Sequence, residues 1–174
     1  SRLSTVDAQE SMNQMNDGLE QLKGSLQGAN FLILTYGTAY YYDHKDYGPV
    51  ANCHKFPSKD FEKKLSSTHE LIDSFDRMLT SLKTVNPNIK VMLTVSPVRH
   101  IKDGIIENNR SKAHLISAVH EICDSNSQCH YLPSYELLID DLRDYRYYAD
   151  DMVHPSDQAI EYIWSKIGEH ILDP

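Results

Sequence analysis

The sequence has 174 residues, of which 40% are hydrophobic and 24% charged, so it is long enough for one globular domain with a packed core. Its formal net charge of −8 argues against a nucleic-acid partner, because proteins that follow a phosphate backbone present a net positive surface. No apolar run approaches the roughly eighteen residues that a membrane span needs, and the first residues lack the apolar core of a signal peptide. We therefore expect a single domain, residues 1–174, that binds neither nucleic acid nor a membrane.

The cysteines and short polar motifs bear on location and cofactors. Cys53, Cys123 and Cys129 are an odd number at no repeated spacing, which favours a reducing compartment, so we expect a cytoplasmic protein. A disulfide between Cys123 and Cys129 stays an alternative. The Asn-Cys-His-Lys run at residues 52–55 invites a zinc site or a cysteine nucleophile, but adjacent Cys and His rarely face one site. Because no HExxH, CxxC or phosphate-binding glycine loop occurs, we expect no metal and no cofactor.

Hydrophobic periodicity predicts the elements in the first half of the chain. A helix begins at about Asp7 and ends at Gly28, with five apolar residues on one face: Met12, Met15, Leu19, Leu22 and Leu26. The apolar run Phe31–Tyr36 predicts a strand covered on both faces by helices, ending at Gly37. After a polar, tyrosine-rich stretch, Ser67-x-x-Glu70 is a capping box that opens a second helix, which Asn86-Pro87 closes.

The second half repeats the alternation of strands and helices. Residues 89–95 predict a second buried strand, a third helix carries Leu115 and Val119, and residues 129–132 predict a third strand. The last helix opens at Pro155 or Ser156 and is expected to bury Ala159, Ile160, Ile163, Trp164 and Ile167. Strands that alternate with helices of this length imply right-handed crossovers and a parallel sheet, so we expect an α/β fold, a three-layer α/β/α sandwich.

Ligands of open parallel sheets bind outside the carboxyl ends of the strands, which directs attention to the segments that follow the three predicted strands and to the loop before the last helix. Ten of the eleven tyrosines lie in two stretches at such ends: Tyr36, Tyr40, Tyr41, Tyr42, Tyr47, Tyr131, Tyr135, Tyr145, Tyr147 and Tyr148. They indicate either loop packing or an aromatic-lined pocket.

The most informative stretch is Asp151-Met-Val-His154-Pro155, directly before the last helix. A carboxylate three residues before a histidine in a turn can accept a hydrogen bond from Nδ1, which fixes the tautomer and leaves Nε2 as a general base. An Asp–His pair that only caps the helix is the structural alternative. After the second strand, Arg99 of the Ser96-Pro-Val-Arg-His100 segment either holds an anionic group or pairs with one of the many acidic residues.

Six segments, in order, resemble motifs of the bacterial GSCFA family, which is itself similar to SGNH/GDSL-type hydrolases. They are residues 35–39 (TYGTA), 50–55 (VANCHK), 94–100 (TVSPVRH), 132–136 (LPSYE), 142–148 (LRDYRYY) and 151–156 (DMVHPS). The resemblance implies a flavodoxin-like sandwich in which His154 is the base and Asp151 its orienter. It also implies that the loop after Tyr36 is the counterpart of the oxyanion segment, so the candidate oxyanion and substrate-binding residues are Gly37, Thr38, Tyr40, Asn52, His54, Arg99 and His100.

Two departures from the family pattern matter. The Gly-Ser-Cys-Phe-Ala motif, whose serine corresponds to the nucleophile, is absent from this sequence, so we expect the domain to be N-terminally incomplete and the nucleophile to lie upstream. Such a sheet has an open flank, which predicts an exposed apolar patch, a dimer or a companion N-terminal fragment. Where SGNH enzymes carry an oxyanion asparagine this chain has Ala39, so Thr38 or Asn52 would have to substitute.

The resemblance and the tyrosines lead to one functional expectation and one alternative. We expect an SGNH-like ester hydrolase or acyltransferase acting on a small-molecule or glycan ester, such as an O-acylated glycan, whose activity needs the upstream serine. Residues 1–174 by themselves are then inactive. The alternative is a non-catalytic module that binds a glycan or a protein through its tyrosine-rich cleft.

Overall fold

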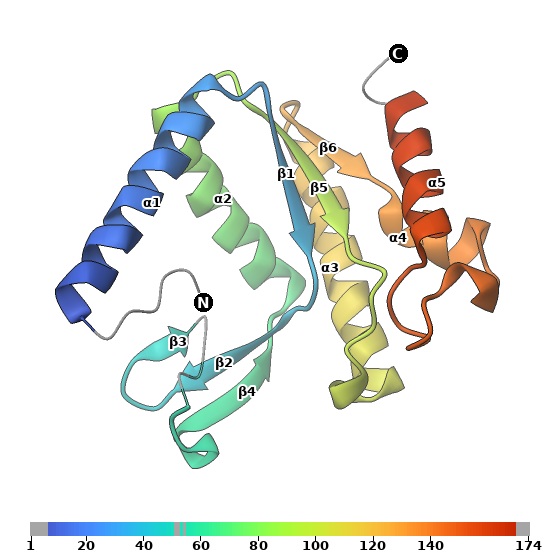
Figure 1. Cartoon of the computed structure of the whole chain (residues 1–174), viewed down its shortest axis with the longest axis horizontal. Helices are drawn as coiled ribbons and strands as arrows, with labels where there is room; N and C mark the ends of the chain where they lie inside the picture. Colours follow the sequence, from blue (N-terminus) through green and yellow to red (C-terminus); the bar gives the residue numbers. More distant parts are fainter. Residues whose placement is uncertain (1–6, 51–52, 54, 170–174) are drawn as a thin grey trace.

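The computed structural model describes residues 7–50, 53 and 55–169, and its centre is a parallel sheet. The sheet has the order β1 (Phe31–Tyr36), β5 (Lys90–Val95), β6 (Cys129–Leu132), with residue 31 paired to residue 90 and residue 91 to residue 129 (Figure 1). All three strands that the sequence predicts are present. Consecutive strands lie side by side, as in one half of a flavodoxin-like sheet.

Helices cover both faces of this sheet (Figure 1). On one face, α2 (Thr68–Val85) and α3 (Ile105–Ser125) pack against alternate residues of β5, among them Val91 and Leu93. On the other face, α5 (Asp157–Ile167) packs through Ala159 and Ile163 against Met92. The predicted α/β/α sandwich is confirmed. The capping box of Ser67 and Glu70 opens α2, and the Ser156 side chain caps α5.

Strand β1 differs from the prediction that helices cover both its faces. Leu32 and Leu34 pack against the core, but Phe31 and Ile33 on the opposite face are 44% and 46% exposed. The reason is that β1 is the edge strand of the sheet within the described residues, so that α5 reaches only part of its outer face. Residues Ile160 and Trp164 of α5, which the sequence places in the core, are exposed for the same reason.

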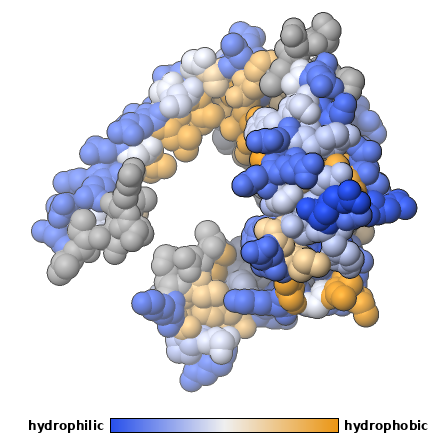
Figure 2. Space-filling model, turned by 45° about the vertical axis from the view of Figure 1, so that its right-hand side comes forward, coloured by the Kyte–Doolittle hydropathy of each residue, from blue (hydrophilic) through white to orange (hydrophobic). Residues whose placement is uncertain are grey.

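Helix α1 (Ala8–Gly28) forms as predicted, with the Asp7 side chain accepting hydrogen bonds at its N-terminus, but its apolar face is not buried. Leu26 contacts the core, whereas four residues of the face are exposed: Met12, Met15, Leu19 and Leu22. Apolar residues gather along one side of the arm that α1 forms (Figure 2). The Asn86 amide holds the base of this arm, donating to the carbonyls of Leu26 and Ala29 at 2.9 Å each.

A second sheet occupies the connection between β1 and α2, where the sequence analysis foresaw only a polar stretch. Strand β2 (Tyr40–His44) pairs antiparallel with β3 (Gly48–Val50) and with β4 (Phe61–Leu65). Its centre is the buried His44 ring, which lies against Tyr47, Phe56 and Phe61. Consecutive tyrosines are good strand formers, and Gly48 supplies the left-handed backbone of the turn, so these two signals could have revealed the hairpin.

Short helical turns complete the chain: η1 (Ser58–Asp60), η2 (Ile101–Asp103), α4 (Ser134–Glu136), η3 (Leu137–Asp141) and η4 (Tyr145–Tyr147). The last three turns form the connection between β6 and α5. Cys123 and Cys129 are free thiols, so the alternative of a disulfide between them is not realised. Over the described stretches of chain, no helix combines the length and the apolar character needed to cross a bilayer.

Candidate functional site

A histidine–aspartate pair lies in the turn that leads into α5. Asp151 Oδ1 accepts the backbone N–H groups of Val153 and His154 at 2.9 Å each, and Oδ2 lies 2.6 Å from His154 Nδ1. Met152 adopts a left-handed conformation (φ 60°), which closes the turn. The contact predicted from the i to i+3 spacing is thus confirmed. The His154 side chain is 63% exposed, so its ring is accessible from solvent.

The charge of Asp151 fixes how the imidazole of His154 is presented. Hydrogen bonds from the His154 backbone, the His154 ring and the Val153 backbone lower the pKa of Asp151 to about 2. The side chain is therefore a carboxylate at neutral pH, and it accepts the proton on Nδ1. In the tautomer of the neutral imidazole that donates from Nδ1 to this carboxylate, Nε2 keeps its lone pair, which is the arrangement that a general base requires.

The segment just before this turn holds the turn in place. The N–H of Ala149 donates to the carbonyl of His154, and the N–H of Ser156 donates to the carbonyl of Tyr147, both at 2.8 Å. Tyr148 and Pro155 form an antiparallel bridge. The tyrosines of the 145–148 segment consequently lie beside the turn that carries His154.

A buried lysine joins the loops that follow β1 and β5. Lys112 of α3 is 1% exposed, and its ammonium donates to the carbonyls of Gly37 and Ser96 at 2.6 Å each. Burial lowers the pKa of Lys112 to about 8. Lys112 is not among the candidate residues predicted from the sequence. The available signal is its position, three residues before Leu115 and seven before Val119, on the buried stripe of α3.

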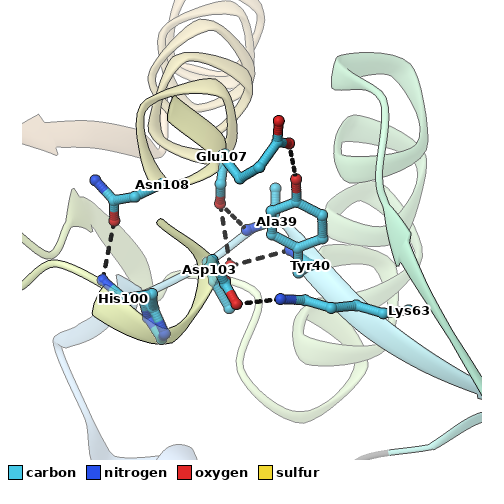
Figure 3. Close-up of polar contacts among 9 residues, drawn as sticks. Ala39, Tyr40, Lys63, His100, Asp103, Glu107 and Asn108 are labelled. Carbon is cyan, nitrogen blue, oxygen red and sulfur yellow. Dashed lines mark hydrogen bonds and ion pairs between the residues drawn. The ribbon is translucent and has the colours of Figure 1, made fainter. Parts of the chain in front are cut away.

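The beginning of α3 organises the loop after β1 through a polar network (Figure 3). Ser111 Oγ accepts the N–H of Ala39 at 2.7 Å and shares a 3.0 Å hydrogen bond with Thr38 Oγ1. The Tyr40 hydroxyl donates to Glu107. The hydroxyls of Thr38 and Tyr40, both oxyanion candidates from the sequence, therefore have partners on α3.

The remaining candidates fall into three groups. Gly37 and His100 lie together, because a Cβ atom at Gly37 would come within 3.4 Å of His100 Nε2, and the backbone N–H of His100 donates to Asn108 at 3.0 Å. Arg99 lies at a different place, in a pocket beside the 145–148 segment. Asn52 and His54 lie outside the described residues.

The pocket that contains Arg99 has a volume of about 180 Å³ and adjoins the His154 turn through Tyr148. Its lining residues are Arg99, Ile139, Arg143, Asp144, Tyr145 and Tyr148. The Arg99 guanidinium lies over the Tyr148 ring, 5.7 Å from its centroid. Tyr148 is thus a shared neighbour of Arg99 and of the turn that carries His154.

Serine hydroxyls near the carboxyl edge are engaged elsewhere. Ser96 Oγ accepts the N–H of Val98, Ser134 Oγ is hydrogen-bonded to Thr94 Oγ1, and Ser156 Oγ accepts the N–H of Ala159. In the part of the chain that the structure describes, no serine hydroxyl hydrogen-bonds the His154 ring. The same residues contain no group of three or more His, Cys, Asp or Glu side chains arranged to hold a metal ion.

Fold and site together define an α/β protein with a histidine–aspartate pair at the carboxyl edge of a parallel sheet. The chain belongs to the GSCFA family, whose family model matches residues 1–167.

Two solved structures are similar to the chain, each at 12% sequence identity. A carbohydrate esterase family 3 protein from Talaromyces cellulolyticus has a TM-score of 0.47, with 87% of this chain and 62% of that chain covered. A family 3 carbohydrate esterase from Clostridium thermocellum has a TM-score of 0.43, with 88% and 66% covered. The chain thus spans roughly two thirds of the length of these proteins, and neither likeness says what the chain acts on. No curated protein matches the sequence.

Proposed function

We propose that this domain supplies the base and its orienter to an ester hydrolase or acyltransferase of the SGNH type. The observation that carries the proposal is the 2.6 Å contact between His154 Nδ1 and Asp151 Oδ2 at the carboxyl edge of the sheet. A carboxylate that holds Nδ1–H leaves Nε2 free to accept the proton of a hydroxyl nucleophile. Membership of the GSCFA family supports the assignment, since the matched residues 1–167 include this pair.

The proposed reaction has two stages, acylation and deacylation, each with two proton transfers at His154. A serine hydroxyl attacks the acyl carbonyl of the substrate, and Nε2 takes the serine proton while the C–O bond to serine forms. Nε2 then returns the proton to the departing alcohol as the original ester bond breaks, and the carboxylate of Asp151 stabilises the imidazolium between the two steps. In deacylation, Nε2 takes a proton from water or a second alcohol as that oxygen attacks the acyl carbonyl, and returns it to the serine oxygen as the acyl–serine bond breaks. Water as the acceptor gives hydrolysis, and an alcohol gives acyl transfer.

The proposal places the nucleophile N-terminal to residue 1. It is supported by the engagement of the hydroxyls of Ser96 and Ser134, neither of which contacts His154 in the described structure. The substrate proposed is an O-acylated glycan or a smaller ester, and the tyrosines beside His154 suit the hydrophobic face of a sugar ring. Residues 1–174 alone then bind substrate without turning it over.

A fluorophosphonate probe tests the proposal. We expect no labelling of residues 1–174, labelling of a chain extended upstream in its gene through a Gly-Ser-Cys-Phe-Ala motif, and loss of that labelling in the extended His154→Gln variant. His130→Gln, at an exposed histidine on β6, is the matched control and should keep the label. Labelling of residues 1–174 at Ser96 or Ser134 would show that the nucleophile is misplaced. An extended chain that stays unlabelled contradicts the enzyme assignment.

A second candidate function is a non-catalytic module that holds a glycan or a protein in the tyrosine-rich cleft. One observation favours it: the pocket with Tyr145, Tyr148 and Arg99 exists without any contribution from a nucleophile. Saturable binding of a glycan by the extended chain, together with absence of ester turnover and of probe labelling, would select this function over catalysis.

A further inference from the structure

We propose that the pocket beside His154 is a binding subsite for a sugar that carries a carboxylate, with Arg99 as the residue that holds the carboxylate. The inference rests on the proposed function in so far as the sugar is part of the substrate. The binding of such a sugar is inferred from the pocket itself and does not require catalysis.

Arg99 is a cation without an anionic protein partner among the described residues. Its side chain is half-buried and its guanidinium lies over the Tyr148 ring. Among the described residues it has no ion pair and no hydrogen bond with a protein group, although the chain carries 25 acidic residues. The neighbouring charges are already paired: Arg143 with Asp140 at 3.3 Å, and Asp144 with Arg146 at 3.1 Å. A half-buried, unpaired guanidinium at the wall of a pocket is a ready partner for an anion.

The geometry of the Arg99 guanidinium and the charges around it favour a carboxylate as the anion. A guanidinium presents a planar fork of N–H donors that matches a planar carboxylate with two parallel hydrogen bonds. Asp144 also lines the pocket, and hydrogen bonds from the Arg146 side chain and backbone lower its pKa, so it is ionised. Its negative charge disfavours a phosphate dianion more than a carboxylate monoanion. Because Arg143 and Asp144 each have an ion-pair partner, Arg99 is the cation of this lining that has none within the described structure, which matches a ligand with a single negative charge.

The aromatic rings and the volume of the pocket suit a sugar as the remainder of the ligand. The rings of Tyr145 and Tyr148 lie with centroids 6.0 Å apart at an angle of 45°, so together they form a bent aromatic wall. Such a wall offers apolar ring faces to the C–H groups of a sugar and hydroxyl groups to its polar edge. The volume of about 180 Å³ is comparable to that of one monosaccharide rather than an oligomer.

The position of the pocket links it to the candidate site. Tyr148 lines the pocket and also forms the antiparallel bridge with Pro155, the residue that follows His154. A sugar that Arg99 and Tyr148 hold thus lies next to the turn that presents the imidazole. An acyl group on that sugar, or on the next one, would come within reach of the proposed base.

The test is binding of sodium D-glucuronate to residues 1–174, followed by NMR of the tyrosine rings. We expect saturable shifts of Tyr145 and Tyr148, with D-glucose, acetate and inorganic phosphate each binding roughly tenfold more weakly or worse. Arg99→Gln should reduce the affinity for glucuronate to that for glucose, and Arg99→Lys should restore part of it. Arg77→Gln, at an exposed arginine on α2, is the matched control and should bind as the parent chain does.

Each contrary result overturns a defined part of the proposal. Equal binding of phosphate overturns the choice of a carboxylate, and equal binding of acetate overturns the role of the sugar. Glucuronate affinity that Arg99→Gln leaves unchanged, in a variant whose NMR spectrum shows the parent fold, overturns the role of Arg99. Because the readout is binding, loss of esterase activity in the extended chain with glucuronate binding retained contradicts the proposed function and leaves this subsite standing. Ester turnover by the extended chain without glucuronate binding contradicts this subsite and leaves the proposed function standing.

Discussion

Asp151 sets the protonation pattern of His154, and this can be measured without any substrate. Nδ1 should carry the proton of the neutral imidazole, because the Asp151 carboxylate lies 2.6 Å away. We expect Asp151→Asn to shift the population towards the Nε2–H tautomer, which ¹⁵N NMR of the ring reports. Asp150→Asn, at the preceding exposed aspartate, is the control. An unchanged tautomer in Asp151→Asn would show that the carboxylate does not orient the ring.

The buried Lys112 predicts a specific dependence of stability on pH. Its pKa in the folded state, about 8, lies below the ordinary 10.5, so the unfolded chain binds more protons between these values. The contribution of Lys112 to the free energy of unfolding should therefore increase as the pH rises from 8 towards 10.5. Between about pH 7.5 and 9.5 we expect the parent to gain about 1 kcal/mol relative to Lys112→Met, a figure that allows for solvent screening.

Urea unfolding of both proteins at the two pH values measures this difference, in which the ionisation of the tyrosines and cysteines cancels. Lys23→Met, at an exposed lysine on α1, should follow the parent at both values. Parallel pH profiles for the parent and Lys112→Met would contradict the prediction.

Among individual residues, the contact between Asp151 and His154 could be predicted from the sequence, whereas the contacts of the residues around it could not. The contact of Asp151 with His154 follows from local spacing, and a turn of four residues determines it. Lys112 is different: its carbonyl partners, Gly37 and Ser96, are distant in sequence and meet it only when β1, β5 and α3 have packed. Whether Arg99 has a partner likewise depends on the placement of the 143–148 segment, which carries no regular periodicity.

Among the elements, α1 depends most on a single side chain. Its described contacts with the core come from its C-terminal end, where the Asn86 amide donates to Leu26 and Ala29. We expect Asn86→Ala to cost about 1–2 kcal/mol, because two carbonyls lose a donor, and to speed hydrogen exchange along α1 more than along α2. Asn88→Ala, two residues on, keeps the Asn86 amide and should leave exchange unchanged. Equal exchange of α1 in both variants would contradict this anchoring role.

The strongly periodic elements could be predicted from the sequence, whereas the small antiparallel sheet could not. The 3.6-residue period of α2 and the mostly apolar sequence of β5, in which every residue from Val91 to Val95 is buried, leave little choice of structure. Strands β2 and β4 alternate weakly between exposed and half-buried residues, and a register between Tyr40 and Leu65 becomes evident only once the chain has turned back. The apolar stripe of α1 predicted the helix correctly but not its exposure, since burial depends on a neighbour that sequence periodicity does not supply.

For the whole molecule, the edge of the sheet is the feature with measurable consequences. The exposed Ile33 of β1 and Trp164 of α5 line one apolar pocket of about 190 Å³ on the uncovered face. An edge strand with apolar side chains tends to recruit another chain. We expect residues 1–174 to self-associate or to retain a companion segment, giving a mass above 20.0 kDa by light scattering and native mass spectrometry.

Ile33→Lys should lower this association, because it places a charge on the open face. Ile106→Lys, at an isoleucine of α3 that is 76% exposed, is the matched control and should associate as the parent does. A stable monomer of 20.0 kDa without a companion, for the parent chain, would show that the edge needs no cover and that the expectation of an incomplete sheet is wrong.

The pairing of distant strands also governs how the molecule comes together in time. Parallel pairing requires residue 90 to find residue 31 and residue 129 to find residue 91, so the central sheet closes long loops and is expected to form slowly. The antiparallel pairs of β2 with β3 join residues that are close in sequence and can form early. Since α5 packs on a face that β5 and β6 create, the turn that carries His154 reaches its place only after this slow closure. The hydrogen bonds of the histidine–aspartate pair are local, but we expect its position at the carboxyl edge of the sheet to be acquired among the last steps of folding.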